Sequence, residues 1–293
     1  MAVPLLDLKA QHATIREEVL SAIMPVIDGQ TFILGHAVEQ IESLVARLSH
    51  TKYAIGCANG TDAILLALRA LDVGRNDAVV TTPFTFFATA GAVHNVGART
   101  VFADIDPDTF NISPEAVDEA VRNTPDAKAV IAVDLFGQMA AIDDLRKVLP
   151  SGMPIIEDAA QSIGASREVD GRKVMAGEMA DIGTFSFFPS KNLGGYGDGG
   201  MIVTQSDELE ARLRRLRTHG SVKTYYHEEV GYNSRLDALQ AVVLSAKLPH
   251  LESWSAARRR NASLYDQAFA DLDGVRTPVI DSHNESIYNQ YTL

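Results

Sequence analysis

Residues 183–201 read G-T-F-S-F-F-P-S-K-N-L-G-G-Y-G-D-G-G-M, with Lys191 at their centre. Aromatic residues precede the lysine, and five glycines occupy the seven positions 194–200. Glycine lets a backbone approach a bound group closely. Apolar surroundings lower a lysine pKa from about 10.4 towards neutrality, and a neutral amine can form a Schiff base. Lys191 is therefore the first candidate catalytic residue, although a surface lysine on a glycine-rich loop is the simpler interpretation of these residues alone.

Composition excludes several classes of protein. The 293 residues suffice for one large domain plus a smaller one, or for two moderate ones. The net charge of −12 argues against nucleic acid as the principal partner, because no surplus of cations is available for phosphates. Cys57 is the single cysteine, so no internal disulfide can form. No apolar run is long enough to cross a membrane, and the N-terminus does not resemble a signal peptide. We expect a soluble, cytoplasmic protein.

Strand-like and helical patterns alternate along most of the chain. This alternation predicts an α/β fold with a mainly parallel sheet and helices on both faces. Strands are expected at residues 53–58, 79–82, 100–105, 128–135, 154–158, 182–188 and 200–204, the last two forming a differently ordered edge. Helices are expected at residues 12–28, 36–50, 62–71, 87–96, 113–123, 141–149, 206–218 and 236–269.

The last residues suggest an incomplete second domain. S-I-Y-N-Q-Y-T-L, residues 286–293, reads as a strand, and the chain stops inside it. One strand cannot complete a sheet, so we expect the C-terminal part to be missing. The predicted division is a large domain of residues 1–250 and the start of a smaller C-terminal α/β domain at residues 251–293.

Polar residues follow two of the expected strands. In an open parallel sheet, ligands bind outside the carboxyl ends of the strands. Gly60 and Thr61 open a helix there, and free N–H groups at a helix N-terminus favour a phosphate. Thr61 could instead cap that helix. Glu157 and Asp158 end another strand, where a buried carboxylate needs a cationic partner such as a protonated pyridine nitrogen. One of them could instead cap a following helix.

Aromatic residues and glycines offer further signals. T-T-P-F-T-F-F-A-T, residues 81–89, provides aromatic side chains that could stack on a flat ring or pack in the core. A G-x-G-x-x-G pattern at residues 195–200 precedes a strand instead of opening a helix, which excludes a dinucleotide site. No P-loop, H-E-x-x-H or C-x-x-C is present, so we expect no metal site. A phosphate site, a ring platform, a carboxylate and an amine are together what pyridoxal phosphate requires.

Several linked motifs resemble one family of enzymes. The motifs are C-A-N-G-T-D-A, P-F-T-F-F-A-T, I-E-D-A-A-Q-S, F-S-F-F-P-S-K-N-L-G with G-D-G-G, and G-Y-N-S-R-L-D-A-L-Q-A. They resemble the DegT–StrS family of nucleotide-sugar aminotransferases, in register from about Pro4 to the end. The resemblance implies the fold-type I architecture of pyridoxal phosphate enzymes and a homodimer with active sites at the subunit interface.

The resemblance also implies roles for individual residues. Lys191 holds pyridoxal phosphate as a Schiff base and moves the proton during catalysis, and Asp158 pairs with the pyridinium nitrogen. Gln161 donates a hydrogen bond to the phenolic oxygen, and Phe86 stacks on the ring. The phosphate is expected to contact Gly60, Thr61, Ser186 and, from the partner subunit, Asn233. The substrate is expected to contact Arg235, and the connecting stretch offers His219, Tyr225 and His227 as further contacts.

The implied reaction is a transamination in two halves. L-glutamate converts the cofactor to pyridoxamine phosphate, and a nucleotide-linked keto sugar then receives the amine, giving an amino sugar for surface polysaccharide or a related glycan. V-G-Y-N-S-R-L-D after Y-Y-H, and Y-N-Q-Y-T-L, are most similar to enzymes that aminate a UDP-linked 3-keto-2-acetamido uronic acid. Arg235 could then bind the uronate carboxylate.

Other functions remain open at this point. The alternatives within the family are amination of a dTDP-linked 3-keto or 4-keto-6-deoxyhexose, and a sugar dehydratase that uses the cofactor without a Schiff-base lysine. A regulatory protein that keeps the fold without catalysis would not require Lys191. A nicotinamide-dependent oxidoreductase would need the glycine pattern at 195–200 to open a helix.

Overall fold

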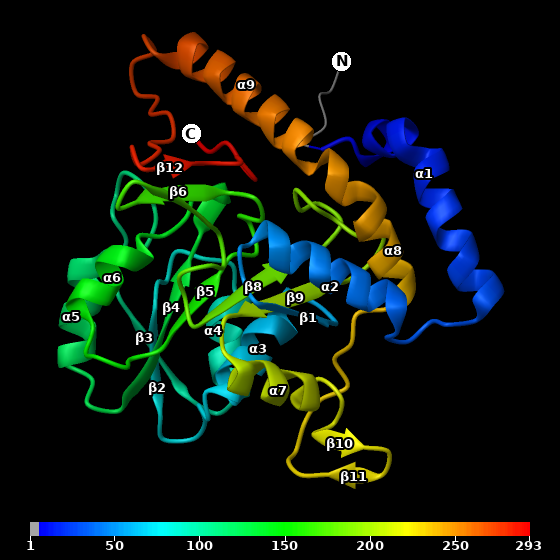
Figure 1. Ribbon diagram of the computed structural model, residues 1–293. Helices are drawn as coiled ribbons and strands as arrows, with labels where there is room; N and C mark the ends of the chain where they lie inside the picture. Colours follow the sequence, from blue (N-terminus) through cyan, green and yellow to red (C-terminus); the bar gives the residue numbers. More distant parts are fainter. Residues whose placement is uncertain (1–5) are drawn as a thin grey trace.

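The computed structural model describes residues 6–293 and is built around a seven-stranded sheet (Figure 1). The strand order is β1 (Tyr53–Cys57), β9 (Gly200–Thr204), β8 (Ile182–Ser186), β5 (Ile155–Asp158), β4 (Ala127–Val133), β2 (Ala78–Thr81) and β3 (Arg99–Phe102). Strands β8, β5, β4, β2 and β3 are parallel, whereas β9 is antiparallel to both of its neighbours. The predicted mainly parallel sheet and its differently ordered edge are thus confirmed.

Helices cover both faces of this sheet. The helices α3 (Gly60–Ala70), α4 (Ala88–Asn95) and α7 (Asp207–Leu216) contribute to one apolar cluster, which also contains Ile156 of β5. On the other face lie α2 (His36–Leu48), α5 (Pro114–Arg122), α6 (Ile142–Val148) and α8 (Ala238–Lys247), with Ile155 of β5. Successive strand residues point to opposite faces, which explains why Ile155 and Ile156 belong to different clusters.

Smaller elements surround this core. Helix α1 (Leu8–Gly29) packs on α8. A turn of 3-10 helix, η2 (Leu248–His250), links α8 to α9 (Leu251–Phe269), and another, η1 (Leu135–Gly137), follows β4. A second sheet has the order β12 (Asn284–Glu285), β6 (Ser166–Val169), β7 (Arg172–Met175). The hairpin β10 (Ser221–Lys223) and β11 (Tyr226–His227) projects below the sheet in Figure 1. No helix among residues 6–293 is long and apolar enough to span a bilayer.

Two expectations about the C-terminal third were wrong. The helix predicted for 236–269 is two helices, because Pro249 interrupts the pattern between α8 and α9. The strand predicted for 286–293 does not form. Its backbone bonds to a turn instead, since Ile287 N donates to Gly137 O at 3.0 Å, and Tyr288 has a left-handed φ of 44°. The division at residue 250 stays a prediction.

A buried ion cluster holds the first strand in place. Glu42 of α2 accepts hydrogen bonds from Arg217 at 2.6 Å and from Arg214 at 2.9 Å. Arg217 also donates to Gly56 O of β1 at 2.8 Å, and the Gly56 N–H donates to Glu42. Charge-assisted hydrogen bonds of this kind fix geometry tightly. The cluster therefore anchors β1 two residues before the loop that leads to Gly60.

Candidate active site

A cavity of about 730 Å³ opens at the carboxyl ends of β4, β5 and β8. The sequence-predicted residues that line it are Gly60, Thr61, Phe86, Asp158, Gln161, Ser186 and Lys191. Its other lining residues are Asn59, Asp62, Ile64, Thr85, Ala88, Val133, Asp134, Leu135, Ala160, Phe188, Ser190, Asp198 and Gln290. The expected place of the site, outside the carboxyl ends of parallel strands, is therefore where these residues meet.

Asp158 is a buried carboxylate that forms no ion pair with another residue of the described chain. It is 6% exposed, and its Oδ2 accepts a hydrogen bond from the Thr89 hydroxyl at 2.8 Å. Thr89 also contacts the hydroxyl of Thr85 at 2.8 Å. Burial raises the pKa of Asp158, while the bonds from Thr89 and the Ala160 N–H and the charge of Lys191 lower it. A turn follows Asp158, not a helix, so the helix-capping alternative is wrong.

Thr89 fixes the Asp158 carboxylate, and its replacement should change the pH dependence of the enzyme. Thr89→Val keeps the shape but removes the hydrogen bond that lowers the pKa of Asp158. The carboxyl then ionises only at higher pH, so we expect the acid limb of kcat/KM to move up by about one pH unit. Thr89→Ser keeps the hydroxyl and should restore the wild-type profile. Identical profiles for Thr89→Val and the wild type would contradict this role.

Lys191 lies at the cavity wall and not on an exposed loop. Its backbone N–H donates to Phe188 O at 2.8 Å, and Phe187 and Leu193 are buried beside it. Burial lowers the pKa of the Lys191 amine, and the Asp158 carboxylate opposes this effect. Within the described chain, no carboxylate forms an ion pair with Lys191. The amine is thus available to a ligand in the cavity.

The start of α3 lines one end of the cavity. Asn59 is the N-cap, and its Oδ1 accepts from Asp62 N at 2.8 Å. The alternative that Thr61 caps this helix is therefore wrong. Gly60 packs against Ser186 so closely that a Cβ at position 60 would lie 2.7 Å from the Ser186 Cβ. N–H groups of the first turn, with two hydroxyls nearby, suit a phosphate.

Gly60→Ala should weaken cofactor binding. The added Cβ forces the Gly60 and Ser186 backbones apart at the phosphate end, and such overpacking costs about 1–3 kcal/mol. We expect pyridoxal phosphate affinity to fall about tenfold or more in an absorbance titration. Gly74→Ala is the matched control, because the nearest atom to a Cβ at that position is 3.8 Å away. Unchanged affinity in Gly60→Ala would refute this location of the phosphate.

Gln161 has a fixed orientation. Its Oε1 accepts from the backbone N–H of Phe136 at 2.7 Å, and Phe136 adopts a left-handed φ of 60° at the end of β4. The side-chain oxygen is thereby used, and the amide NH₂ is left as the donor at the cavity. This suits the predicted bond to a phenolic oxygen. Phe86 lines the cavity too and is 73% exposed, so its ring is not part of the core.

Asn233 and Arg235 lie in a neighbouring cavity. This cavity, of about 510 Å³, shares Asn59 and Asp198 with the first one. Asn233 is exposed, and no hydrogen bond or ion pair links the Arg235 side chain to another described residue. The structure therefore does not bring these two residues into the cavity of Lys191 within one chain.

The remaining predicted residues lie farther out. His219, Tyr225 and His227 are exposed on the hairpin β10–β11 and its approach, and none lines either cavity. Tyr225 is 92% exposed, and His227 Nδ1 contacts the carbonyl of His219 at 3.0 Å. In a single chain these residues face solvent.

Sequence reasoning missed several residues of the first cavity. Phe86 and Phe87 stand between Thr85, which lines the cavity, and Thr89, whose hydroxyl bonds to Asp158, and no motif indicated these two hydroxyls. Gln290 reaches the cavity from the segment predicted as a strand, and its N–H bonds to Phe136 O at 3.3 Å. Nothing in the local sequence indicates this long-range contact.

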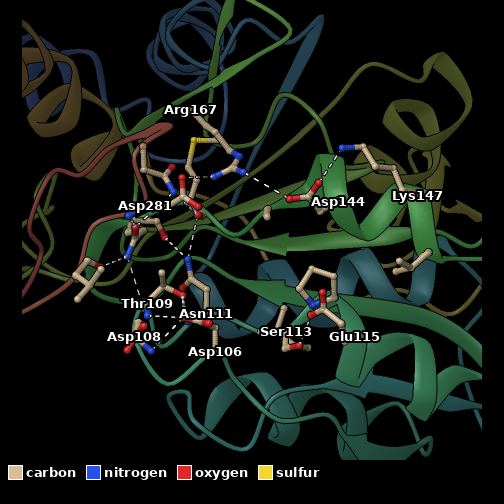
Figure 2. Close-up of a pocket in the computed structure, with 18 residues that line it drawn as sticks. Asp106, Asp108, Thr109, Asn111, Ser113, Glu115, Asp144, Lys147, Arg167 and Asp281 are labelled. Carbon is tan, nitrogen blue, oxygen red and sulfur yellow. Dashed lines mark hydrogen bonds and ion pairs between the residues drawn. The ribbon is translucent and has the colours of Figure 1, made fainter.

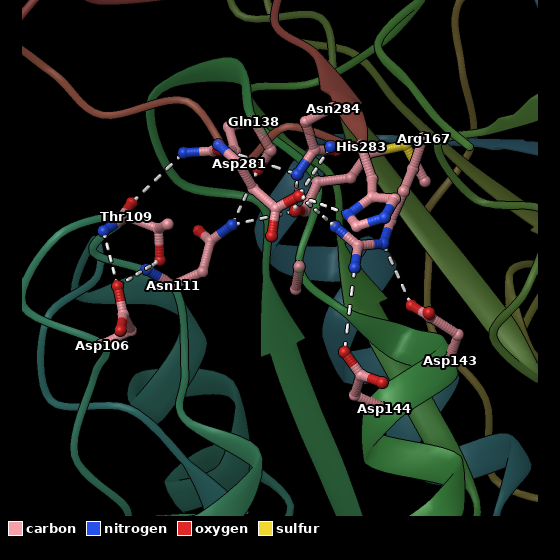
Figure 3. A network of polar contacts seen from close by, with 12 residues as sticks. Asp106, Thr109, Asn111, Gln138, Asp143, Asp144, Arg167, Asp281, His283 and Asn284 are labelled. Carbon is pink, nitrogen blue, oxygen red and sulfur yellow. Dashed lines mark hydrogen bonds and ion pairs between the residues drawn. The ribbon is translucent and has the colours of Figure 1, made fainter. Parts of the chain in front are cut away.

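A separate cavity of about 520 Å³ contains none of the predicted site residues (Figure 2). Its most buried ionic group is Arg167, which is 4% exposed. Figure 3 shows Arg167 between Asp143, Asp144 and Asp281, at 3.0, 3.8 and 3.3 Å. These ion pairs tie β6 to α6 and to the segment before β12. The charge of Arg167 is thus compensated within the protein.

The first cavity fits pyridoxal phosphate. A close-packed glycine at a helix N-terminus suits its phosphate, an unpaired buried carboxylate suits its ring nitrogen, and an amine with a lowered pKa suits its aldehyde. These features belong to Gly60, Asp158 and Lys191. The predicted nicotinamide alternative finds no support, because the glycine pattern leads into β9 and not into a helix.

Comparisons with known proteins agree with this geometry. The model of the DegT/DnrJ/EryC1/StrS aminotransferase family matches residues 13–293. A Geobacillus stearothermophilus protein named pleiotropic regulatory protein is 47% identical over 298 residues, which covers 100% of this chain and 78% of that protein. The Pseudomonas aeruginosa UDP-2-acetamido-2-deoxy-3-oxo-D-glucuronate aminotransferase is 42% identical over 292 residues, which covers 99% of this chain and 79% of that enzyme.

Among solved structures, S. venezuelae DesV in complex with a ketimine intermediate matches with a TM-score of 0.94 and 39% identity, covering 99% of this chain and 76% of that one. The predicted architecture of a pyridoxal phosphate aminotransferase is thereby confirmed. The chain belongs to the DegT/DnrJ/EryC1/StrS aminotransferase family, whose enzymes use pyridoxal phosphate.

Proposed function

We propose that this enzyme transfers an amino group from L-glutamate to the keto group of a nucleotide-linked sugar, giving an amino sugar for a surface glycan. The observation that carries the proposal is the convergence of Lys191 and Asp158 on one cavity with a phosphate-binding end. The relative that aminates a UDP-linked 3-oxo uronate supports the substrate class. Glutamate as the donor is proposed on the resemblance alone.

Each catalytic residue has a defined task in this reaction. When bound, pyridoxal phosphate supplies an electron-accepting ring that stabilises negative charge on the carbon bearing the amine. Asp158 keeps a negative charge at the ring nitrogen and so holds the proton there. Lys191, whose amine pKa burial has lowered, attaches the cofactor and then moves a proton as base and acid. Gln161 donates its amide N–H to the phenolic oxygen.

The other cavity residues are proposed to bind and orient the cofactor. Gly60, Thr61 and Ser186 hold the phosphate at the start of α3. Phe86, which lines the cavity, would stack on the cofactor ring and shield it from water. Together these residues would hold the cofactor in the cavity that Lys191 lines.

We propose that two copies of the chain form a homodimer and complete each other's sites. Asn233 of one copy would reach the phosphate of the other, and Arg235, His219, Tyr225 and His227 would reach its substrate. Large apolar side chains are exposed on α1 and on the hairpin, including Met24 at 49% and Tyr226 at 60%. Apolar surfaces of this kind are typical of protein interfaces.

Arg235 is the proposed determinant of a uronate substrate. Its guanidinium has no carboxylate partner in the described chain and can bind a carboxylate bidentately. Arg235→Ala should raise KM for a UDP-linked 3-oxo uronate about tenfold to a hundredfold, with a smaller change in kcat. KM for a dTDP-linked keto-deoxyhexose, which lacks the carboxylate, should stay unchanged. Equal effects on both substrates would contradict carboxylate recognition and favour the deoxyhexose alternative.

A regulatory role is the second candidate, because one relative is named a regulatory protein. The deciding experiment adds pyridoxal phosphate to the purified protein, records visible absorbance before and after L-glutamate, and then measures amino-sugar formation. Loss of the visible band with glutamate, followed by amination of a keto sugar, supports the aminotransferase. A band that ignores glutamate favours a dehydratase or another donor. No band in the folded protein would refute catalysis and leave the regulatory role.

Two further proposals concern organisation and location. Residues 251–293 begin a smaller C-terminal domain, starting with α9. A cytoplasmic location, suggested by the single cysteine, stays a prediction.

A further inference from the structure

Two carboxyl groups lie on the face of the sheet opposite Asp158. Glu157 precedes Asp158 on β5, and successive side chains of a strand point to opposite faces. Glu157 pairs with Ala132 of β4, and Asp134 follows two residues later on the same face. The α3 and α4 face therefore receives Asp158, and the α2 and α6 face receives Asp134 and Glu157.

No cation compensates these two groups. Both residues are 0% exposed, and the ion pairs found between described residues include neither. Asp134 accepts hydrogen bonds from Ala140 N at 2.8 Å and from the Ser162 hydroxyl at 2.6 Å. Both oxygens of Glu157 are buried and receive no hydrogen bond from any N–H or O–H donor of the described chain. Two ionised carboxyls so placed would be strongly unfavourable.

Two hydrogen bonds stabilise the charged form of Asp134, whereas Glu157 accepts none from the described chain, and this difference indicates that the proton resides on Glu157. Burial, and next the adjacent Asp134, raise the pKa of Glu157 well above its usual value. Burial also raises the pKa of Asp134, but hydrogen bonds from Glu157, Ser162 and Ala140 lower it. These differences favour Asp134 as the acceptor and Glu157 as the donor. The two titrate as a pair.

We propose that the Glu157 carboxyl group stays protonated at neutral pH and donates a hydrogen bond to the Asp134 carboxylate. The pair then places one fixed negative charge on the far side of the sheet from Asp158. Glu157 and Asp134 are then positioning residues. The negative charge of the Asp134 carboxylate opposes ionisation of Asp158 in the cofactor-free protein. It also favours a cation at the position of the ring nitrogen. This second step rests on the proposed role of Asp158, whereas the shared proton does not.

The other charged groups near Glu157 and Asp134 do not provide the negative charge that we assign to Asp134. Glu178 approaches Glu157 from the turn after β7, but its carboxylate pairs with Arg172 and with His50 at 3.2 Å. Lys191 acts on Asp158 from the cavity side. The Gly177 N–H also lies near Glu157, but it does not reach hydrogen-bond geometry.

Infrared spectroscopy of the cofactor-free protein tests the shared proton. At pH 7 the wild type should show the carbonyl absorption of one buried protonated carboxyl group. Glu157→Gln, which can still donate an N–H to Asp134, should lose this absorption, and Asp158→Asn should keep it. Absence of the band from the wild type, or its persistence in Glu157→Gln, would overturn the proposal. A protein that shows the band but never transaminates would refute the proposed function and leave the shared proton intact.

Titration of Asp158 tests the charge. For each cofactor-free protein, the infrared spectrum is compared with that of the same protein carrying Asp158→Asn, and the difference reports protonation of Asp158. The pH at which half of this difference is reached is the midpoint of Asp158 titration. In an Asp134→Asn background the midpoint should fall by about one pH unit, because the neighbouring negative charge is gone. In a Glu157→Gln background, which preserves that charge, the midpoint should stay within about 0.3 units. An unchanged or raised midpoint in Asp134→Asn would overturn the electrostatic role.

Discussion

Lys191→Ala is expected to abolish transamination while the protein stays folded. Lys191 is the lysine among the described residues that line the cavity, and burial lowers the pKa of its amine. Without it, no covalent attachment of the cofactor and no proton transfer at the reacting carbon can occur. The loss in kcat should be on the order of 10⁴-fold or more, as for other enzymes that lose their nucleophile. The visible absorbance of the attached cofactor should disappear as well.

A surface lysine is the control for this experiment. Lys52→Ala removes an exposed amine that pairs with Asp207 at 2.5 Å, directly before β1 and outside the lining of the cavity, and should leave kcat and the spectrum unchanged. Circular dichroism and urea unfolding of both variants establish that folding is retained. A Lys191→Ala protein that still transaminates at more than about one hundredth of the wild-type rate would show that another amine carries the reaction.

The positions of Gly60, Thr61 and Asp158 at one cavity could be predicted from sequence because their signals are local. A strand followed by N-G-T and a helix, and a second strand ending in E-D, place polar groups at one edge of any parallel sheet. Lys191 was identifiable because aromatic residues and glycines flank it directly. These residues meet in the structure as expected.

What the sequence could not predict depends on long-range contacts. The segment 286–293 has strand-like alternation, but it bonds to the turn at Phe136 and Gly137, which lies about 150 positions earlier. A Cβ at Gly137 would meet Asn289 N at 2.7 Å, so this docking requires glycine there. The pairing of Glu157 with Asp134 likewise follows only from the order of β4 and β5 in the sheet.

Asp158→Asn should separate two functions of the Asp158 carboxylate, which accepts the hydrogen bond from Thr89 and carries the negative charge proposed to face the ring nitrogen. Asparagine keeps the shape of the side chain and can still accept the hydrogen bond from Thr89, but it carries no charge. The ring nitrogen then loses the anion that keeps it protonated. Removal of one fixed electrostatic group from an active site costs about 10²- to 10³-fold in rate. We expect a fall of that size in kcat, with the cofactor still attached to Lys191.

The same substitution should make attachment of the cofactor easier at low pH. The Asp158 carboxylate raises the pKa of the Lys191 amine, against the larger lowering by burial. Without that charge the pKa falls further, so a larger fraction of the amine is neutral at a given pH below it. The pH midpoint for development of the visible absorbance should therefore decrease in Asp158→Asn. A decrease in kcat together with a lower midpoint requires Asp158 to face both the ring nitrogen and Lys191, whereas a raised midpoint would place the carboxylate out of reach of the amine.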